Sequence, residues 1–433
     1  MSKLLCTLLI FITLSAKAQE TYSISGTVID ERGMTVPGAV VFITNSKYIQ
    51  ATNNEGKFNF NNIRPGTYEI VARMLGLEPG TQSIKVSNNV VNLEINLKPS
   101  NKLLNTVTIN EKPDPDREKY LAWFIQHFIG ETVNSQQCKL LNPGVIHFHF
   151  NKSTRVLTTT ADDFLVVENK ALGYKIKYLL SGFEIDLNNQ SGYYDGYPYF
   201  EEMEGDAVQQ KKWQDNRKLA YLSSARHFFR AIMNNTAEQE GFIVYEVTND
   251  LDIINKSKNV DRTQTIAIVP DPDAATDETE QSKTKENTHK TIQSQQKSFT
   301  LPPGSRAIVK VLHADSLFSA EDANFKSLTS AIKISGKDTI KRISLFIVYT
   351  GATEPLLFSK TGHPITSLML QHLPAKRQIT KMQWLTDKIT IDHNGIPAPE
   401  MGYKYGGYWA WQRIADLTPL DYFVEPEAPV IKK

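Results

Sequence analysis

The feature that most constrains this chain is a series of closely spaced turn signals between Ser23 and Leu97. Gly33, Gly56 and Gly66 stand where turns require a positive φ, which glycine adopts without steric cost. The segments between these turns are short and alternate between apolar and polar residues. This spacing predicts about seven short strands that form one small β-sandwich.

One face of these predicted strands carries the apolar residues that form the expected core. Pro37 should lie at the start or edge of a strand, because proline cannot donate a ladder hydrogen bond. The predicted core positions are Val28, Val41, Phe58, Phe60, Tyr68, Ile70, Val86, Leu93 and Ile95.

Four motifs in this region carry a family resemblance. They are Gly26-x-Val28-x-Asp30-x-x-Gly33, Val36-Pro37-Gly38-Ala39-x-Val41, Thr52-Asn53-x-x-Gly56-x-Phe58 and Ile63-x-Pro65-Gly66-x-Tyr68. Together they resemble the carboxypeptidase regulatory-like domain, a transthyretin-like (prealbumin-like) β-sandwich. The family often has Asp at the position of Asn53 and an aromatic residue at that of Leu77. The resemblance implies an accessory module without catalytic residues, in an envelope protein of a Gram-negative bacterium.

Similar domains precede TonB-dependent receptors of the outer membrane, where a Leu-x-x-Val-x-Val segment leads into the next part of the chain. Leu104-Asn-Thr-Val-Thr-Ile109 resembles that segment. The residues after Ile109 lack a long run of regularly alternating strands, so we do not expect a complete receptor.

The first residues have the pattern of an export signal. Lys3 precedes an apolar run from Leu4 to Leu14, and Ala16-Lys17-Ala18 matches a small-x-small cleavage site. We expect residues 1–18 to be removed and the mature chain to begin at Gln19. The chain is predicted to be exported and to be periplasmic or associated with the outer membrane.

Composition limits the classes of partner. Without Lys3 and Lys17 the formal net charge falls from +1 to −1, which gives no electrostatic case for nucleic acid. Cys138 is then the one remaining cysteine, so we expect no intrachain disulfide. No later segment has 18 uninterrupted apolar residues, and we expect no transmembrane segment in the mature chain.

The remainder of the chain reads as a larger β-rich α+β domain at residues 118–433, so the predicted fold class is mainly β. The first domain is expected at residues 19–109, followed by a polar linker at 110–117. Residues 270–298 are almost free of large apolar residues, which predicts a disordered insertion.

Two helices and a series of strands are expected in this larger domain. The predicted helices are 116–134 and 209–234, the second with Trp213, Leu219, Leu222, Phe229 and Ile232 on its buried side. The predicted strands are 145–150, 155–160, 164–168, 175–187, 242–247, 306–312, 331–335, 339–349, 366–370 and 388–392.

Motifs for catalysis are missing. No histidine is followed by Glu three residues later, so the zinc-binding pair of a metallocarboxypeptidase is absent. His147 and His149 should share one strand face and are weak metal candidates, since no third ligand is fixed nearby. We therefore predict no cofactor, and Cys138 reads as an inert thiol.

Two kinds of side chain are candidates for binding. Arg226 and Arg230 lie one helical turn apart and could hold a carboxylate or phosphate, or pair with nearby Glu201, Glu202 or Glu204. Aromatic residues beside glycine could stack on a sugar or hold a peptide, or could simply pack. These candidates are Tyr194, Tyr197, Tyr199, Tyr408, Trp409 and Trp411.

The favoured function is an exported, non-catalytic binding or scaffolding protein of the cell envelope. Its partner would be an envelope protein or a glycan. Two alternatives stay open: a peptidase or glycosidase with widely separated site residues, and a carbohydrate-binding protein that uses the aromatic clusters.

Overall fold

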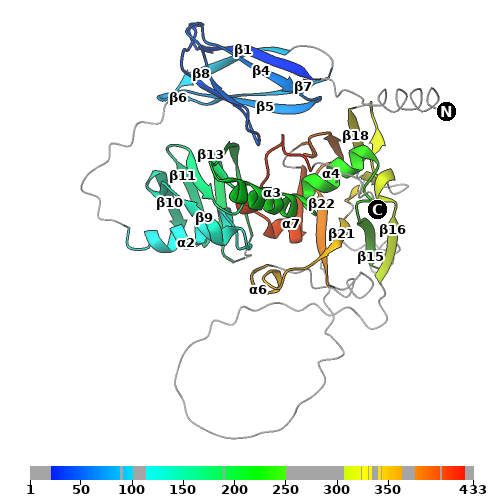
Figure 1. Cartoon of the computed structure of the whole chain (residues 1–433). Helices are drawn as coiled ribbons and strands as arrows, with labels where there is room; N and C mark the ends of the chain where they lie inside the picture. The colour runs from blue at the N-terminus through cyan, green and yellow to red at the C-terminus, as the bar shows by residue number, and fades with distance from the viewer. Residues whose placement is uncertain are drawn as a thin grey trace, which may run out of the picture.

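The computed structural model has three β-rich parts that pack against one another (Figure 1). It describes residues 21–87, 91–100, 114–188, 191–249, 307–322, 324–329, 331–333, 340–342, 344–362, 376–399 and 402–424. The insertion predicted at 270–298 and the strand predicted at 366–370 lie outside these residues.

The first part is a sandwich of two four-stranded sheets, at the top of Figure 1. One sheet has the order β4 (Lys57–Ile63), β1 (Tyr22–Asp30), β8 (Val91–Pro99) and β6 (Leu77–Glu78). The other has the order β3 (Ile49–Ala51), β2 (Val40–Ile43), β5 (Gly66–Arg73) and β7 (Gly80–Val86). The sandwich is confirmed, with eight strands rather than seven because the two-residue β6 gave no alternation to detect.

All nine predicted core positions of the sandwich are buried. The turn glycines adopt the expected conformation, as at Gly56, where φ is +72°. A Cβ there would lie 2.8 Å from the Val28 carbonyl oxygen, so close packing also requires glycine.

The second part is a six-stranded sheet with one covering helix. It contains β9 (Cys138–Leu140), β10 (Ile146–Asn151), β11 (Val156–Ala161), β12 (Leu165–Asn169), β13 (Tyr174–Asp186) and β14 (Ser191–Glu202). The order is β10-β11-β13-β12-β9, and β14 pairs with β13. Helix α2 (Arg117–Phe128) covers one face, where Tyr120, Phe124 and Phe128 enter the core. The short 3-10 turns Ser135–Gln137 and Pro143–Val145 flank β9.

The third part is built on a five-stranded sheet. Its order is β16 (Ala307–Leu312), β15 (Phe242–Asn249), β21 (Ser344–Thr353), β22 (Arg377–Trp384) and β24 (Tyr403–Gly407). Smaller sheets contain β17 (Ser319–Ala320), β18 (Phe325–Thr329) and β23 (Lys388–Asp392), and β19 (Ala331–Lys333) with β20 (Ile340–Arg342). The short helices are α6 (Phe358–Thr361) and α7 (Tyr408–Trp411), with 3-10 turns at Ala314–Ser316 and Ile414–Asp416.

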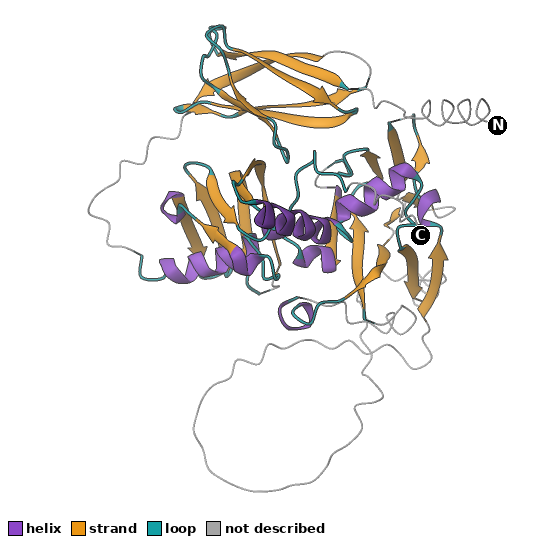
Figure 2. Ribbon diagram, viewed as in Figure 1, coloured by secondary structure: helices purple, strands orange, loops and turns teal. Residues whose placement is uncertain are grey.

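The region predicted as one larger domain has two separate hydrophobic cores, one under each large sheet. Helices α3 (Ala207–Tyr221) and α4 (Ala225–Asn234) connect them across the middle of the molecule (Figure 2).

The single helix predicted at 209–234 is wrong, because the chain turns between α3 and α4. Ser223 has φ of +68°, and the Ser224 side chain caps α4 by accepting a hydrogen bond from the His227 backbone. Because the helical spacing of apolar residues continues through this turn, the sequence pattern did not indicate a break. Leu219, predicted to be buried, is 70% exposed.

Candidate functional site

The outer face of the six-stranded sheet, opposite α2, forms a row of polar side chains. The strand registers place His149 opposite Thr158, Thr158 opposite Glu184, and Glu184 opposite Tyr193. Directly opposed residues share a sheet face, so this row runs across β10, β11, β13 and β14. The intervening residues Phe148 and Phe183 point into the core under α2.

Tyr193 is the aromatic side chain on this face that is most open to solvent, at 51% exposed. Its ring lies over Gly182, where a Cβ would be 3.7 Å from Cε2 and 4.0 Å from Oη. A β-bulge at this point of β13 leaves Gly182 opposite Asp195. The absence of a side chain on Gly182 therefore leaves room for the ring, and about half of the Tyr193 side chain stays exposed to solvent.

Two carboxylates flank the ring. Glu184 is directly opposite Tyr193, and Asp195 is two residues further along the same face of β14. Neither carboxylate has a cationic partner among the ion pairs of the described residues. We call Gly182, Glu184, Tyr193 and Asp195 the Tyr193 platform.

The sandwich covers the neighbouring part of the same sheet face. Phe42 and Val71 of the sandwich form an apolar cluster with Leu179 and Tyr199 of the sheet. The ring centroids of Phe42 and Tyr199 are 5.0 Å apart. At the edge of this contact, Arg73 binds Asp163 at 2.8 Å. The predicted binding residue Tyr199 is thus part of the interface between the two parts.

Backbone hydrogen bonds also join the sandwich to β14. The Asn45 N–H donates to the Pro198 carbonyl at 2.6 Å, and the Phe200 N–H donates to the Ser46 carbonyl at 2.9 Å. The loop after β2 therefore lies beside β14 as a short parallel strand. Pro198 has no N–H to lose at this sheet edge, which suits it to the position.

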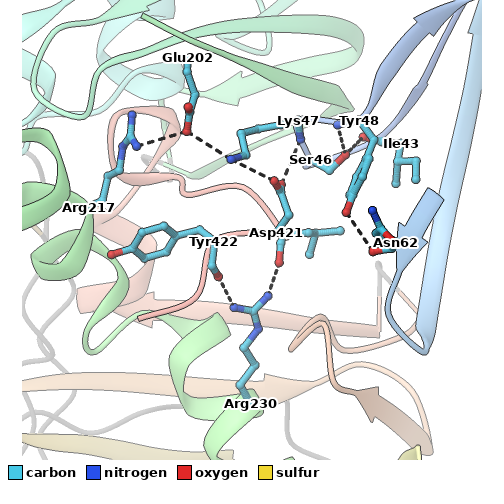
Figure 3. A network of polar contacts seen from close by, with 11 residues as sticks. Ile43, Ser46, Lys47, Tyr48, Asn62, Glu202, Arg217, Arg230, Asp421 and Tyr422 are labelled. Atoms are coloured by element: carbon cyan, nitrogen blue, oxygen red, sulfur yellow. Dashed lines mark hydrogen bonds and ion pairs between the residues drawn. The ribbon is translucent and has the colours of Figure 1, made fainter. Parts of the chain in front are cut away.

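Residues 418–423, which we call the 418–423 segment, connect the sandwich to α4 (Figure 3). The Leu420 N–H donates to the Asn45 carbonyl at 2.6 Å, and the Leu420 side chain enters the sandwich core. Lys47 of the sandwich contacts Asp421 at 3.3 Å and Glu202 of β14 at 3.2 Å. Arg217 of α3 also reaches Glu202, at 3.4 Å.

Arg226 and Arg230 hold the other side of this segment. The Arg230 guanidinium donates to the carbonyls of Leu420 at 2.5 Å, Tyr422 at 2.7 Å and Asn394 at 3.2 Å. Arg226 donates to the Thr418 carbonyl. Burial, together with the nearby charge of Arg230, lowers the pKa of Arg226 to about 9. Neither arginine uses the nearby glutamates in these contacts; their acceptors are backbone carbonyls.

A second contact joins the sandwich to the third part. The buried Asp392 carboxylate accepts a hydrogen bond from the Thr67 N–H at 2.5 Å, and the Asn394 side-chain amide donates to the Thr67 carbonyl at 2.8 Å. Burial raises the pKa of Asp392 above its usual range. Both backbone groups of Thr67 are satisfied by side chains from a different part of the molecule.

The second aromatic cluster lies in the core. Tyr408, Trp409 and Trp411 are each less than a tenth exposed and pack under the five-stranded sheet. The Trp409 indole donates to the Ser223 carbonyl at 2.5 Å, and that of Trp411 donates to the Thr361 hydroxyl at 3.0 Å. These rings have no open face to offer a ligand.

His147, His149 and Cys138 belong to no group of potential metal ligands among the described residues. His147 and His149 lie on the outer face, as predicted, and His147 Nε2 is 2.6 Å from Asp162 Oδ2. In the described part of the chain, no three His, Cys, Asp or Glu side chains are grouped to hold a metal ion. Burial raises the pKa of Cys138 to about 12, which keeps it a thiol.

Three of the predicted binding residues, Tyr194, Tyr197 and Tyr199, lie on β14, but none of them belongs to the Tyr193 platform. Tyr194 packs inward against Phe128, whereas Tyr197 lies at the edge of the sandwich contact. Glu184 and Asp195 were not singled out. The alternation of Tyr193, Asp195 and Tyr197 was a readable strand signal that would have placed all three on one face.

Comparison with known families supports the identity of the sandwich. Residues 24–109 match the family described as "CarboxypepD_reg-like domain". This range covers β1 to β8 and confirms the carboxypeptidase regulatory-like domain predicted from the motifs. No curated protein matches the chain.

Solved structures are similar to this chain over about a fifth of its length. The major pilin subunit BcpA of Bacillus cereus is 19% identical, covering 18% of this chain and 30% of that chain, with a TM-score of 0.16. Shaft pilin SpaA from Lactobacillus rhamnosus GG is 16% identical, and the match covers 19% of this chain and 47% of that chain with a TM-score of 0.17. The 3-chlorocatechol 1,2-dioxygenase of Rhodococcus opacus 1CP is 11% identical, and the match covers 20% of this chain and 63% of that chain with a TM-score of 0.17. The chain spans less than two thirds of each of these proteins.

Among the helices of the described residues, none combines the length and the apolar character needed to cross a bilayer.

Proposed function

We propose that this chain is an exported, non-catalytic binding or scaffolding protein of the cell envelope, located in the periplasm or at the outer membrane. The observation that carries the proposal is the way the sandwich is bonded into the rest of the chain. Asn45 and Ser46 pair with β14, and Thr67 is held by Asp392 and Asn394. A module fixed by buried contacts on both sides provides a preorganised surface, which lowers the entropic cost of binding.

The binding surface in this proposal is the part of the outer sheet face that the sandwich leaves open. Tyr193 is half exposed there, whereas Tyr199 on the same strand is buried by the sandwich. The sandwich therefore forms one wall beside the Tyr193 platform. An exposed ring on a rigid sheet is the kind of anchor that contributes strongly to interfaces.

Export and partner capture test this function together. The tagged full-length chain is expressed in its own cells, and the mass of the envelope-associated form is measured; we expect a chain that begins at Gln19. Chemical crosslinking in intact cells should then trap an envelope component. The Tyr193→Ala variant should reduce this crosslink, and Leu75→Ala, which changes an 88% exposed side chain on the sandwich, should not.

Two results would overturn the proposal. One is retention of the unprocessed chain in the cytoplasm. The other is hydrolysis of a peptide or glycan by the purified mature protein, especially if a chelator abolishes it.

A further inference from the structure

We infer that the Tyr193 platform binds the cationic side chain of an extended, basic segment of a partner protein. This inference rests on the proposed binding function and names the chemistry of the partner. It concerns the four residues of the platform, and it uses neither the arginines nor the buried aromatic cluster.

Charge is the first argument. Glu184 and Asp195 flank one ring, and neither has a cationic partner among the ion pairs of the described residues. An arginine or lysine brought to the ring would complete two ion pairs that the chain itself leaves incomplete.

The ring is the second argument. One side of Tyr193 rests on Gly182, and half of the side chain remains open to solvent. A guanidinium or ammonium group placed over the face of a tyrosine is attracted by the quadrupole of the ring. The two carboxylates beside the ring favour a cationic ligand over a neutral one, because their negative charge attracts a cation to the same position.

The strand edge is the third argument, and it favours an extended segment. β14 pairs with β13 along its length, and the Asn45–Ser46 loop occupies its other edge only at Pro198 and Phe200. Among the backbone hydrogen bonds of the described residues, none joins the other edge of Gly192 to Gly196. A peptide can continue the pairing begun by the sandwich loop and place every second side chain over the platform.

Binding of defined peptides to the purified mature protein tests the inference. A fluorescein-labelled peptide of alternating Gly and Arg is compared with its Gly and Gln counterpart by fluorescence anisotropy, at low and at physiological salt. We expect the Arg peptide alone to bind, with an affinity that falls as salt rises.

Variants assign the binding to the platform. Tyr193→Ala should weaken the Arg peptide about fivefold, whereas Tyr193→Phe, which keeps the ring, should stay within about twofold. Combined Glu184→Gln and Asp195→Asn should weaken it about tenfold or more. Glu94→Gln, which changes an exposed carboxylate on β8, is the matched control and should have no effect.

Three outcomes would overturn the inference: no binding of the Arg peptide, equal weakening by Glu94→Gln, or Tyr193-dependent binding of a neutral oligosaccharide such as maltohexaose without the Arg peptide. If the crosslink in cells still depends on Tyr193 in these cases, the proposed function stands and the cationic ligand is wrong. If the crosslink fails while the Arg peptide binds, the platform chemistry stands and the envelope role is wrong.

Discussion

Replacing Gly66 with alanine should loosen the contact between the sandwich and the third part of the chain. A Cβ on Gly66 would lie 2.5 Å from Asn394 Nδ2 and 3.0 Å from its Cγ. The Asn394 amide would have to move, and it would lose the 2.8 Å hydrogen bond to the Thr67 carbonyl. The neighbouring bond from Thr67 to the buried Asp392 carboxylate would be strained as well.

The expected cost follows from two contributions. An unsatisfied buried acceptor costs about 1–3 kcal/mol. A side chain at a backbone conformation that favours glycine costs about 1–2 kcal/mol more. The sum of about 3 kcal/mol is a large part of a typical unfolding free energy of about 5–15 kcal/mol.

Gly38→Ala is the matched control. Gly38 has φ of +74°, and a Cβ there would have no neighbour within 4 Å. Gly38→Ala should therefore lower the free energy of unfolding by the backbone cost alone. Gly66→Ala should lower it by about 2 kcal/mol more. Urea unfolding followed by far-ultraviolet circular dichroism and by tryptophan fluorescence measures both variants, and it shows whether the parts unfold together.

A double-mutant cycle isolates the clash. Asn394→Ala alone leaves the same Thr67 carbonyl without its donor and should cost about 1–3 kcal/mol. Because it also removes the atoms that Gly66→Ala would strike, the double variant should be more stable than additivity predicts by about 1 kcal/mol or more. Additive effects, or equal costs for Gly66→Ala and Gly38→Ala, would refute this account of the interface.

Three further predictions concern single buried groups. Arg230→Ala removes the donor for three backbone carbonyls and should destabilise the chain by about 3–5 kcal/mol in the same urea assay. The control Lys119→Ala, on the exposed side of α2, should cost less than about 0.5 kcal/mol. Burial raises the pKa of Asp416 to about 6, so its protonated form stabilises the fold below the unfolded pKa of about 3.9, and this stability is lost as pH rises through 6. The melting temperature measured by calorimetry at pH 5 and at pH 7.5 should therefore differ less in Asp416→Asn, because about 1.4 kcal/mol of this stability is lost between the two pH values; an unchanged difference would contradict the assignment. Cys138, whose pKa is raised to about 12 by burial, should resist iodoacetamide at pH 7.5 in the folded chain and react fully in urea; equal rates in both states would show that the thiol is not protected.

The sandwich could be predicted closely because its determinants are local. Turns at Gly33 and Gly56 are marked by a glycine at positive φ, and strands such as β1 and β8 alternate with period two. Val28 and Phe58 could therefore be placed in the core without knowing what they contact. The strand at Lys388–Asp392 was predicted to the residue for the same reason.

The site was less predictable because it depends on register between distant strands. Glu184 and Tyr193 become neighbours through the pairing of β13 with β14, and Gly182 supports the ring because of a bulge that no local pattern encodes. The turn at Ser223 was missed for a related reason, since the helical apolar spacing carries through it.

The arginines show why residue type alone identified a binding motif but not what it binds. A guanidinium offers five donors in a fixed fork, which suits a carboxylate or phosphate but equally suits several backbone carbonyls. Arg230 meets carbonyls because the 418–423 segment returns from the end of the third part and lies against α4. That segment also places Leu420 in the sandwich core, so the first and the last described parts of the chain are stabilised by the same residues. Removal of the sandwich would therefore expose the Leu420 side chain. It would also change the surroundings of the Leu420 carbonyl, which accepts a hydrogen bond from Arg230. An accessory domain attached in this way acts as a structural part of the binding body, and its contribution to function is to fix the open face of the sheet beside it.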